Sequence, residues 1–536
     1  MSQHSFLNPL ALSVDEALAP YRKYFRNFTF LVTAILLCVW LGVFLTPERS
    51  NSGLADLGAL MVIVCGLLPA WIWVSGKMQG LPIIPAIAAY DIVWYASPIL
   101  AGHPELQNYP EESVFFAGVT VSLYLLGLTA AWLIVGGVTL KPPKHFRGFA
   151  QTKKGYARIV DVCFVLLVAA MGWQLAEMAL WDEKLWAYIP SAMKTPIRVV
   201  LGLGGLLALF VLSFISGRKA MSFGKRLTFI GLTVVYFLAA GATLLLFKLI
   251  TPMIAIALGF SIGRGRFPWK TMLIIVLIAG FFHVGKGEMR EEYWYGVLRR
   301  ADPVYLTDFP GYYAEWAGHS VNALTGEGPA GRQVNQEETT SIFLRMSLVQ
   351  MLMMAQDKAP SQVEFLEGKT YVVIPQVLVP RIIWPNKPRA LVGQDIINMH
   401  FGLQDEDGTI RTAIAWGLAA EAYANFGVPA VFLTGMFFGA FFGLLAHWSR
   451  QVPMGSYRFV ITLLIFSGAI ILSQTALSVW ASSLFQGFVV VTGLSIFLMK
   501  RFSNERLWRK WQEEQPRSLA ARNAPETWGV AEQQTP

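Results

Sequence analysis

The stretch that decides the fold is residues 227–263, LTFIGLTVVYFLAAGATLLLFKLITPMIAIALGFSIG, in which Lys248 is the one charged residue. As a single helix it would be about 55 Å long at 1.5 Å per residue. The hydrocarbon core of a bilayer is only about 30 Å thick. The stretch therefore predicts two membrane-spanning helices joined by a turn near Lys248.

Similar apolar stretches recur along the chain. Of its 536 residues 54% are hydrophobic and 14% charged, whereas a soluble domain has about 25% charged residues. This composition excludes a soluble protein and predicts an all-α polytopic membrane protein with about 12 transmembrane helices and one large extracytoplasmic loop. Windows of about 19 residues place the spans at 28–46, 55–76, 81–101, 114–139, 158–179, 198–216, 227–244, 246–263, 271–287, 429–447, 458–474 and 480–499.

The distribution of Lys and Arg predicts the orientation. Of the 43 Lys and Arg residues, 26 fall on the side of the two termini and 5 in the short connections of the other side. Since short cytoplasmic loops are rich in Lys and Arg, both termini are predicted to be cytoplasmic, in a bacterial inner membrane. The net charge of +9 follows this pattern and does not indicate nucleic-acid binding.

These assignments divide the chain into five parts. They are a cytoplasmic N-terminal segment (1–27), transmembrane helices 1–9 (28–287), a large extracytoplasmic loop with interfacial helices (288–428), transmembrane helices 10–12 (429–499) and a cytoplasmic tail (500–536). Structureless loops of such length are uncommon in compact proteins and are usually functional. We therefore expect the functional site in residues 288–428.

The sharpest signal in this loop is the segment VPRIIWPNKPR at 379–389. Its prolines restrict the backbone, so Arg381, Lys387 and Arg389 project from a stiff chain. Guanidinium groups match phosphate oxygens in a bidentate manner, and Lys adds a point charge. The segment predicts a phosphate or pyrophosphate site, with a solvated basic loop as the alternative.

Acidic residues supply the other candidates. Glu421 and Asn425 are four residues apart in an apolar run and share one face if the run is helical; a hydrogen bond made only for packing is the alternative for Glu421. Asp91 interrupts the third span, where an acid is a functional candidate by default; a buried hydrogen bond between helices is the alternative. The triplet 405–407, Asp-Glu-Asp, has the acid-x-acid form of some metal sites, but before Gly408 it favours a solvated turn. No metal site or other cofactor is predicted.

The runs GKTY and VPRIIWPNKPR, followed by EAYANFG and a membrane span, resemble the bacterial oligosaccharide repeat-unit polymerases, also called O-antigen or Wzy-type polymerases. The specific part of the resemblance covers about residues 368–428. It implies a fold similar to the glycosyltransferase C class. It also implies transfer of a growing glycan from undecaprenyl pyrophosphate to a sugar hydroxyl of the next lipid-linked repeat unit, at the outer face of the membrane. The implied partners are these lipid-linked oligosaccharides, membrane lipids, and a chain-length regulator and flippase of the same pathway.

This chemistry requires cations for the pyrophosphate and a base for the hydroxyl. Arg290 and Lys248 are candidates to add charge to the basic segment, and Glu421 and His400 are equal candidates for the base. Arg411, Tyr423, Asn425 and Asp91 are further candidates for the site.

Two other functions remain open from the sequence. A ligase would pass a finished glycan from the same donor to another acceptor. A transporter or flippase for lipid-linked oligosaccharides would have a similar number of spans, but such proteins tend to have two similar halves, and no internal repeat is visible here. The long loop favours an enzyme.

Overall fold

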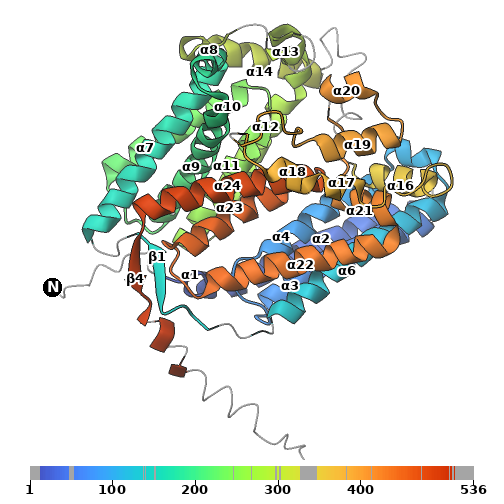
Figure 1. The fold of residues 1–536 in the computed structure, drawn as a ribbon, viewed down its shortest axis with the longest axis horizontal. Helices are drawn as coiled ribbons and strands as arrows, with labels where there is room; N and C mark the ends of the chain where they lie inside the picture. The colour runs from blue at the N-terminus through green and yellow to red at the C-terminus, as the bar shows by residue number, and fades with distance from the viewer. Residues whose placement is uncertain are drawn as a thin grey trace, which may run out of the picture.

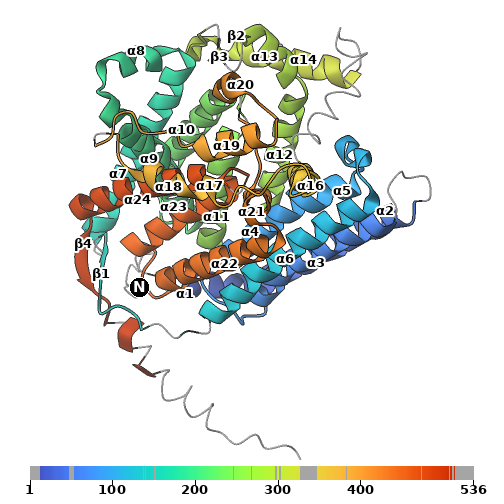
Figure 2. The same ribbon diagram turned by 45° about the vertical axis from the view of Figure 1, so that its right-hand side comes forward.

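The computed structural model describes residues 12–46, 53–136, 138, 141–149, 153–245, 247–266, 268–295, 299–300, 303–325, 347–381, 383–411, 413–472, 474–505, 507–509 and 512–513. They form a helical bundle with a cap of short helices at one end (Figures 1 and 2).

The helices before the loop form the larger part of the bundle. In chain order they are α1 (Val14–Leu18), η2 (Ala19–Tyr21), α2 (Arg22–Phe44), α3 (Gly53–Val74), α4 (Ile83–Asp91), the π-helical turn η3 (Ile92–Ala96), α5 (Ser97–Leu100), η4 (Pro104–Asn108), α6 (Glu111–Gly136), α7 (Lys153–Met178), α8 (Trp181–Tyr188), α9 (Ser191–Gly217), α10 (Phe223–Ala242), α11 (Phe247–Arg264) and α12 (Trp269–Val284).

The later elements form the cap and complete the bundle. The cap holds α13 (Lys286–Tyr293), η5 (Leu306–Asp308), α14 (Phe309–Thr325), α16 (Val349–Lys358), α17 (Lys369–Val372), α18 (Ile374–Leu378), α19 (Val392–His400), α20 (Glu406–Arg411) and α21 (Leu418–Phe426). The bundle ends with α22 (Val428–Arg450), α23 (Tyr457–Leu472) and α24 (Leu477–Leu498).

The structure is that of a mostly helical, multi-pass membrane protein. Eight of the described helical segments are long and apolar enough to cross a membrane, and a ninth is added if α12 and α13, bent by 54°, count as one span. Each of the twelve stretches picked out by hydropathy coincides with a helix or helix series, but α11, α23 and α24 do not meet the same length and hydropathy test. Twelve spans therefore remain a prediction. The 227–263 stretch divides between α10 and α11, as its length requires.

Glycines allow close contact between α6 and α22. A Cβ on Gly435 or Gly439 would lie 2.1 Å from the carbonyl oxygen of Tyr124 or Leu128. Small residues four apart allow helix backbones to approach closely in membranes. This contact fixes α22, and with it the short helix α21 that precedes it.

The first and last described segments of the chain lie at the same end of the bundle. Strand β1 (His145–Gly148) pairs antiparallel with β4 (Lys500–Ser503), an element that the helical hydropathy pattern did not predict. Asp15 of α1 forms an ion pair with Arg450 of α22, and the Met454 amide donates to the Leu12 carbonyl at 2.9 Å. The segments preceding α2 and following α24 thus lie on the same side, as the even number of predicted spans requires. Figure 1 shows β1, β4 and α1 at this end.

The opposite end carries the loop. The Met-rich helix α16 buries Leu352 and Met353 and packs against α6 and α21. Helices α17, α18 and α19 all pack against α24. A short pair of strands, β2 (Trp294–Tyr295) and β3 (Arg299–Arg300), follows α13.

Candidate functional site

The site begins with α21, a nine-residue helix bounded by two glycines. Gly417 and Gly427 have φ of +77° and +72°, which side chains with a Cβ rarely adopt. The two glycines thereby mark the ends of the helix, and every residue from Leu418 to Asn425 is buried. The face carrying Glu421 and Asn425 is enclosed by protein.

Glu421 is the central acid of this region. It is 1% exposed. Its Oε2 accepts a hydrogen bond at 2.6 Å from the amide of Leu477, the first residue of α24. Its Oε1 is buried without a hydrogen-bond partner among the described residues. The N-terminus of α24 holds the carboxyl because helix N-termini carry unpaired amides and partial positive charge.

Asn425, one helical turn later, connects α21 to the GKT turn. Its Nδ2 donates to the Thr370 hydroxyl at 2.9 Å and to the Glu421 carbonyl at 2.8 Å. Its Oδ1 accepts from the Gly368 amide at 3.0 Å. Gly368 has φ of +87°, which turns the chain so that Thr370 faces α21. The predicted shared face of Glu421 and Asn425 is present.

Burial controls the ionisation of Glu421. It raises the pKa of this carboxyl from 4.5 to about 7, while the Leu477 amide and the Thr370 hydroxyl act to lower it. The buried charge of Glu421 in turn adds to burial in raising the pKa of the Tyr371 phenol. A carboxyl with a pKa near neutrality can accept and return a proton at physiological pH, so this group is chemically suited to be a base.

The basic segment connects α18 to α19, and both of these helices pack against α24, the helix that binds Glu421. Exposed Arg381 donates to the Pro385 carbonyl at 2.8 Å, and Lys387 Nζ donates to the Val377 carbonyl at 2.6 Å. Burial, followed by repulsion from Arg381, lowers the pKa of Lys387. Arg381 and Lys387 therefore lie near one another, and neither forms an ion pair with a carboxylate in the part of the chain that the structure describes.

Arg389 is placed differently. Its Nη2 forms an ion pair with Asp395 at 2.8 Å and donates to the Thr409 carbonyl at 3.1 Å. It thus connects α19 to α20, and its charge is already matched by an acid. The side chain of Arg411, at the end of α20, lies outside what the structure describes.

Lys248 and Arg290 have partners in another part of the fold. Lys248 pairs with Glu177. Arg290 donates to the Leu244 carbonyl at 2.7 Å and lies 4.4 Å from the centroid of the Trp294 ring. These contacts tie both cations to the turn between α10 and α11, and none connects them to residues 374–411.

His400 and Tyr423 also have identifiable neighbours. The His400 ring lies at the C-terminal end of α19, with Nε2 2.8 Å from the Glu364 carbonyl oxygen, whereas Gly393 at the other end of α19 is the residue that approaches Thr370. The Tyr423 hydroxyl donates to the Ala359 carbonyl at 3.4 Å. Of the two predicted bases, Glu421 is the one inside the α17–α21–α24 network.

Asp91 ends α4, immediately before the π-helical turn η3, and is 3% exposed. Its neighbour Tyr90 accepts a hydrogen bond from Gln474, whose carbonyl accepts from the Gly417 amide at 2.9 Å. Gln474 therefore links the helix that carries Asp91 to the residue before α21, the helix of Glu421.

The acidic triplet begins a helix. Asp405 Oδ1 accepts from the Gly408 amide at 2.7 Å, so it caps α20, and all three acids are exposed. The predicted turn is thus the first turn of a short helix, in which the Asp405 carboxylate satisfies an orphan amide.

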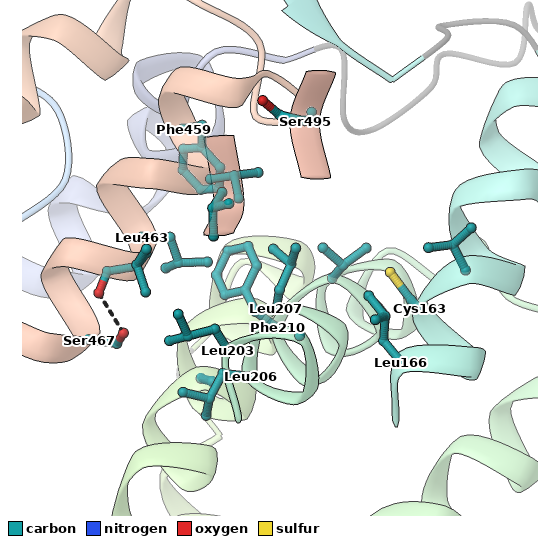
Figure 3. A pocket seen from close by; sticks show the side chains of 18 of the residues that line it. Cys163, Leu166, Leu203, Leu206, Leu207, Phe210, Phe459, Leu463, Ser467 and Ser495 are labelled. Carbon is teal, nitrogen blue, oxygen red and sulfur yellow. Dashed lines mark hydrogen bonds between the residues drawn. The ribbon is translucent and has the colours of Figure 1, made fainter. Parts of the chain in front are cut away.

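An apolar cavity of about 150 Å³ lies between α7, α9, α11, α23 and α24 (Figure 3). The residues that line it include Cys163, Leu203, Phe210 and Phe459, which are labelled in the figure. The C-terminal half of α24 forms part of this lining, and the N-terminus of the same helix binds Glu421.

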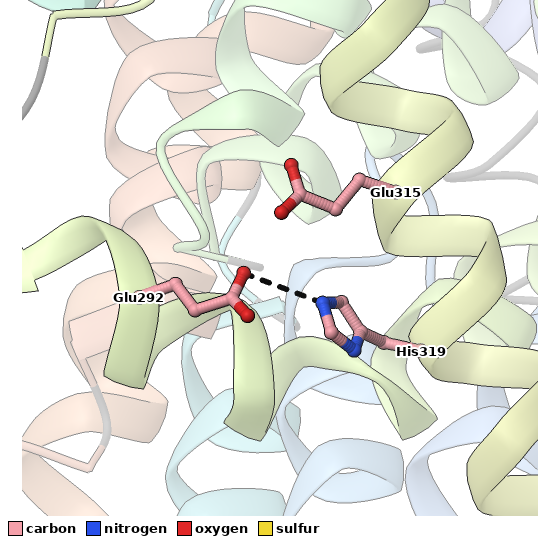
Figure 4. Close-up of side chains that lie close together, drawn as sticks. All are labelled: Glu292, Glu315 and His319. Atoms are coloured by element: carbon pink, nitrogen blue, oxygen red, sulfur yellow. Dashed lines mark hydrogen bonds and ion pairs between the residues drawn. The ribbon is translucent and has the colours of Figure 1, made fainter.

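A second polar cluster, which the sequence reasoning missed, lies between α13 and α14 (Figure 4). One ligand atom from each of Glu292, Glu315 and His319 lies within 4.8 Å of the others. The available signal was the four-residue spacing of Glu288 and Glu292, repeated in Glu315 and His319. These residues could hold a metal ion.

Comparison with known proteins places the Glu421 region in a recognised unit. A family described as a domain of unknown function (DUF8712) matches residues 321–503. This span contains α16 to α24 with the basic segment, His400 and Glu421, and it excludes Asp91, Lys248 and Arg290. Neither a curated protein nor a solved structure matches the chain.

Proposed function

We propose that the protein is a membrane glycosyltransferase that polymerises lipid-linked oligosaccharide repeat units. The donor is a glycan on undecaprenyl pyrophosphate, and the acceptor is a sugar hydroxyl of a second lipid-linked unit. Both would reach the α17–α21–α24 region from the outer face of a bacterial inner membrane, with the two termini in the cytoplasm. The products would be O-antigen or exopolysaccharide chains.

The observation that carries the proposal is that α24 contacts both a buried acid with a pKa of about 7 and the segment that holds two cations without an ion pair among the described residues. Glu421 supplies the acid. Arg381 and Lys387 supply the cations, on a segment that packs against the same helix, α24. A base and a site for a leaving anion are the two groups that glycosyl transfer from a pyrophosphate requires.

The proposed reaction is a single displacement at the anomeric carbon. The acceptor hydroxyl oxygen bonds to this carbon and gives its proton to Glu421. The bond from the carbon to the pyrophosphate oxygen breaks, and the leaving group keeps the electron pair. Arg381 and Lys387 stabilise the resulting negative charge, and Asn425 with Thr370 holds Glu421 in place. Because Glu421 is 1% exposed, the residues that cover it must move before the acceptor can reach it.

The hydrophobic part of the donor has a matching surface. From Leu477 to Val490, a residue of the apolar cavity, α24 rises about 20 Å. A C55 chain is long enough to follow this helix from the site into the bundle. Helix α24 thus contacts Glu421 at its N-terminus and lines the apolar cavity with its C-terminal half.

Purified full-length protein in nanodiscs, supplied with lipid-linked repeat units, tests the proposal. We expect a ladder of products that grows by one repeat per step and undecaprenyl pyrophosphate released in equal amount. Transfer of preformed polymer to a different lipid acceptor, without elongation, would identify a ligase. Movement of the intact lipid-linked unit across the bilayer, without new glycosidic bonds, would identify a transporter.

A further inference from the structure

Helices α13 and α14 bring two pairs of potential metal ligands together. Glu288 and Glu292 are four residues apart on α13, and Glu315 and His319 are four residues apart on α14. Residues at this spacing share one face of a helix. The two faces meet, and Figure 4 shows Glu292, Glu315 and His319 turned toward one another.

The orientation of His319 is set by Glu288. Its Nδ1 lies 2.5 Å from Glu288 Oε2, so Nδ1 carries the proton and donates it to the carboxylate. In the neutral ring Nε2 then keeps its lone pair. Nε2 lies 3.3 Å from Glu292 Oε2, on the side of the two other carboxylates. A carboxylate that fixes one nitrogen so that the other can coordinate is a common outer partner of metal-bound histidine.

Glu315 is held in a similar way. The Tyr293 hydroxyl donates to Glu315 Oε2 at 2.7 Å, which leaves Oε1 available to the cluster. The His319 ring and the Glu315 carboxyl are thus each positioned by a separate residue of α13.

Electrostatics favours a cation in the centre. Three carboxylates gathered around one imidazole repel one another, and a bound divalent cation offsets this repulsion. The nearest basic residues of α13 have contacts elsewhere, with Arg290 against Leu244 and Trp294, and Lys286 Nζ 3.4 Å from His283 Nε2.

We propose that Glu292, Glu315 and His319 bind a first-row divalent cation such as Mn²⁺ or Zn²⁺. Mixed carboxylate and imidazole donors suit these ions better than Mg²⁺ or Ca²⁺, which prefer oxygen ligands. Small side-chain rotations bring atoms within 4.8 Å to the metal–ligand distances of about 2.0 to 2.2 Å. The ion fastens α13 to α14 and, with three protein ligands, keeps a position for water or another ligand. The proposal is independent of the proposed glycosyl transfer.

Metal binding by the purified full-length protein tests this site directly. The protein is stripped with EDTA and dialysed, and Mn²⁺ is added while the signal of free Mn²⁺ is followed by electron paramagnetic resonance. We expect one Mn²⁺ per chain, displaced by Zn²⁺ and not by Mg²⁺. Glu292→Gln and His319→Gln should each weaken binding at least tenfold. Glu291→Gln removes a neighbouring exposed carboxylate and should bind as the unaltered protein does.

Folding and binding are separable in this test. Glu292 is 46% exposed at its side chain, so Glu292→Gln is expected to fold, and circular dichroism with size-exclusion chromatography verifies this. Absence of stoichiometric Mn²⁺ or Zn²⁺ binding by the unaltered protein would overturn the proposal. Equal binding by Glu291→Gln, Glu292→Gln and His319→Gln protein would overturn it as well, because the ion would then be held elsewhere.

Discussion

Glu421 and the Glu292–Glu315–His319 cluster place the same carboxyl group in opposite surroundings. Glu421 is alone, 1% exposed and bonded to a backbone amide. In the cluster, Glu292 and Glu315 are exposed and face each other across a histidine. Isolation in a low-dielectric interior favours the protonated acid, whereas crowding at the surface favours a bound cation. The first setting suits proton transfer, and the second suits metal binding.

The largest expected effect is that of Glu421→Gln on glycan transfer. Glutamine keeps the shape and can still accept from the Leu477 amide, so the fold should persist, but the side chain cannot take a proton. We expect a 10²- to 10⁴-fold loss of polymer formation, the usual contribution of a general base. Glu364→Gln, an exposed neighbour in the cap, should be fully active. Normal polymer from Glu421→Gln would reduce Glu421 to a cap for α24.

Arg381→Ala should cause the next largest loss, of about 100-fold in rate, because one cation no longer faces the developing negative charge. Arg381→Lys should recover part of it, since the planar fork is lost while the charge remains. Lys225→Ala, which removes an exposed cation paired with Asp161 near the termini, is the matched control. The rate is measured with the same lipid-linked repeats. If Arg381→Ala and Lys225→Ala were equally active, the basic segment would be a solvated loop.

The pH dependence should have opposite signs for activity and stability. The ionised form of Glu421 is the base, so with a pKa of about 7 polymer formation should be about tenfold slower at pH 6 than at pH 8. Because folding raises the pKa of Glu421, this carboxyl ionises at a lower pH in the unfolded chain than in the folded protein. The contribution of this group to the free energy of unfolding is present below pH 4.5 and is lost as pH rises through about 7.

Initial rates of polymer formation and unfolding midpoints, both measured from pH 6 to pH 8, test the two predicted pH dependences. In Glu421→Gln protein the stability should lose its dependence on pH in this window. A rate that falls from pH 6 to pH 8, or an unfolding midpoint that rises over the same range only in the unaltered protein, would contradict the assignment.

The sequence predicted much of the Glu421 region for physical reasons. Hydropathy identifies apolar helices locally, and a four-residue spacing places Glu421 and Asn425 on one face without knowledge of the fold. The contact between Glu421 and Leu477 could not be predicted, because it joins residues 56 apart through the packing of α21 on α24. Similarly, the prolines indicated a stiff basic segment, but the pairing of Arg389 with Asp395 depends on how α19 folds back.

The α13–α14 cluster shows the opposite case. Each half has a local signal, the four-residue spacing, but such pairs are common on exposed helices. Only the packing of α13 on α14 brings His319 to Glu292. The strand pair β1–β4 was missed for a related reason, since two four-residue strands so far apart in the sequence, with His145 paired to Ser503, leave no periodic pattern.

The smallest expected effect is that of His400→Ala, and it sharpens the choice between the two predicted bases. His400 Nε2 lies 2.8 Å from the Glu364 carbonyl oxygen, so the ring is occupied with the backbone of the segment before the GKT turn. Loss of one such hydrogen bond costs about 0.5 to 1.5 kcal/mol of stability, which should lower the unfolding midpoint slightly and leave the rate of transfer within about twofold. His400→Gln, which can restore the bond, should recover the midpoint. A loss of activity in His400→Ala as large as that in Glu421→Gln would make the imidazole the base and leave Glu421 with a positioning role.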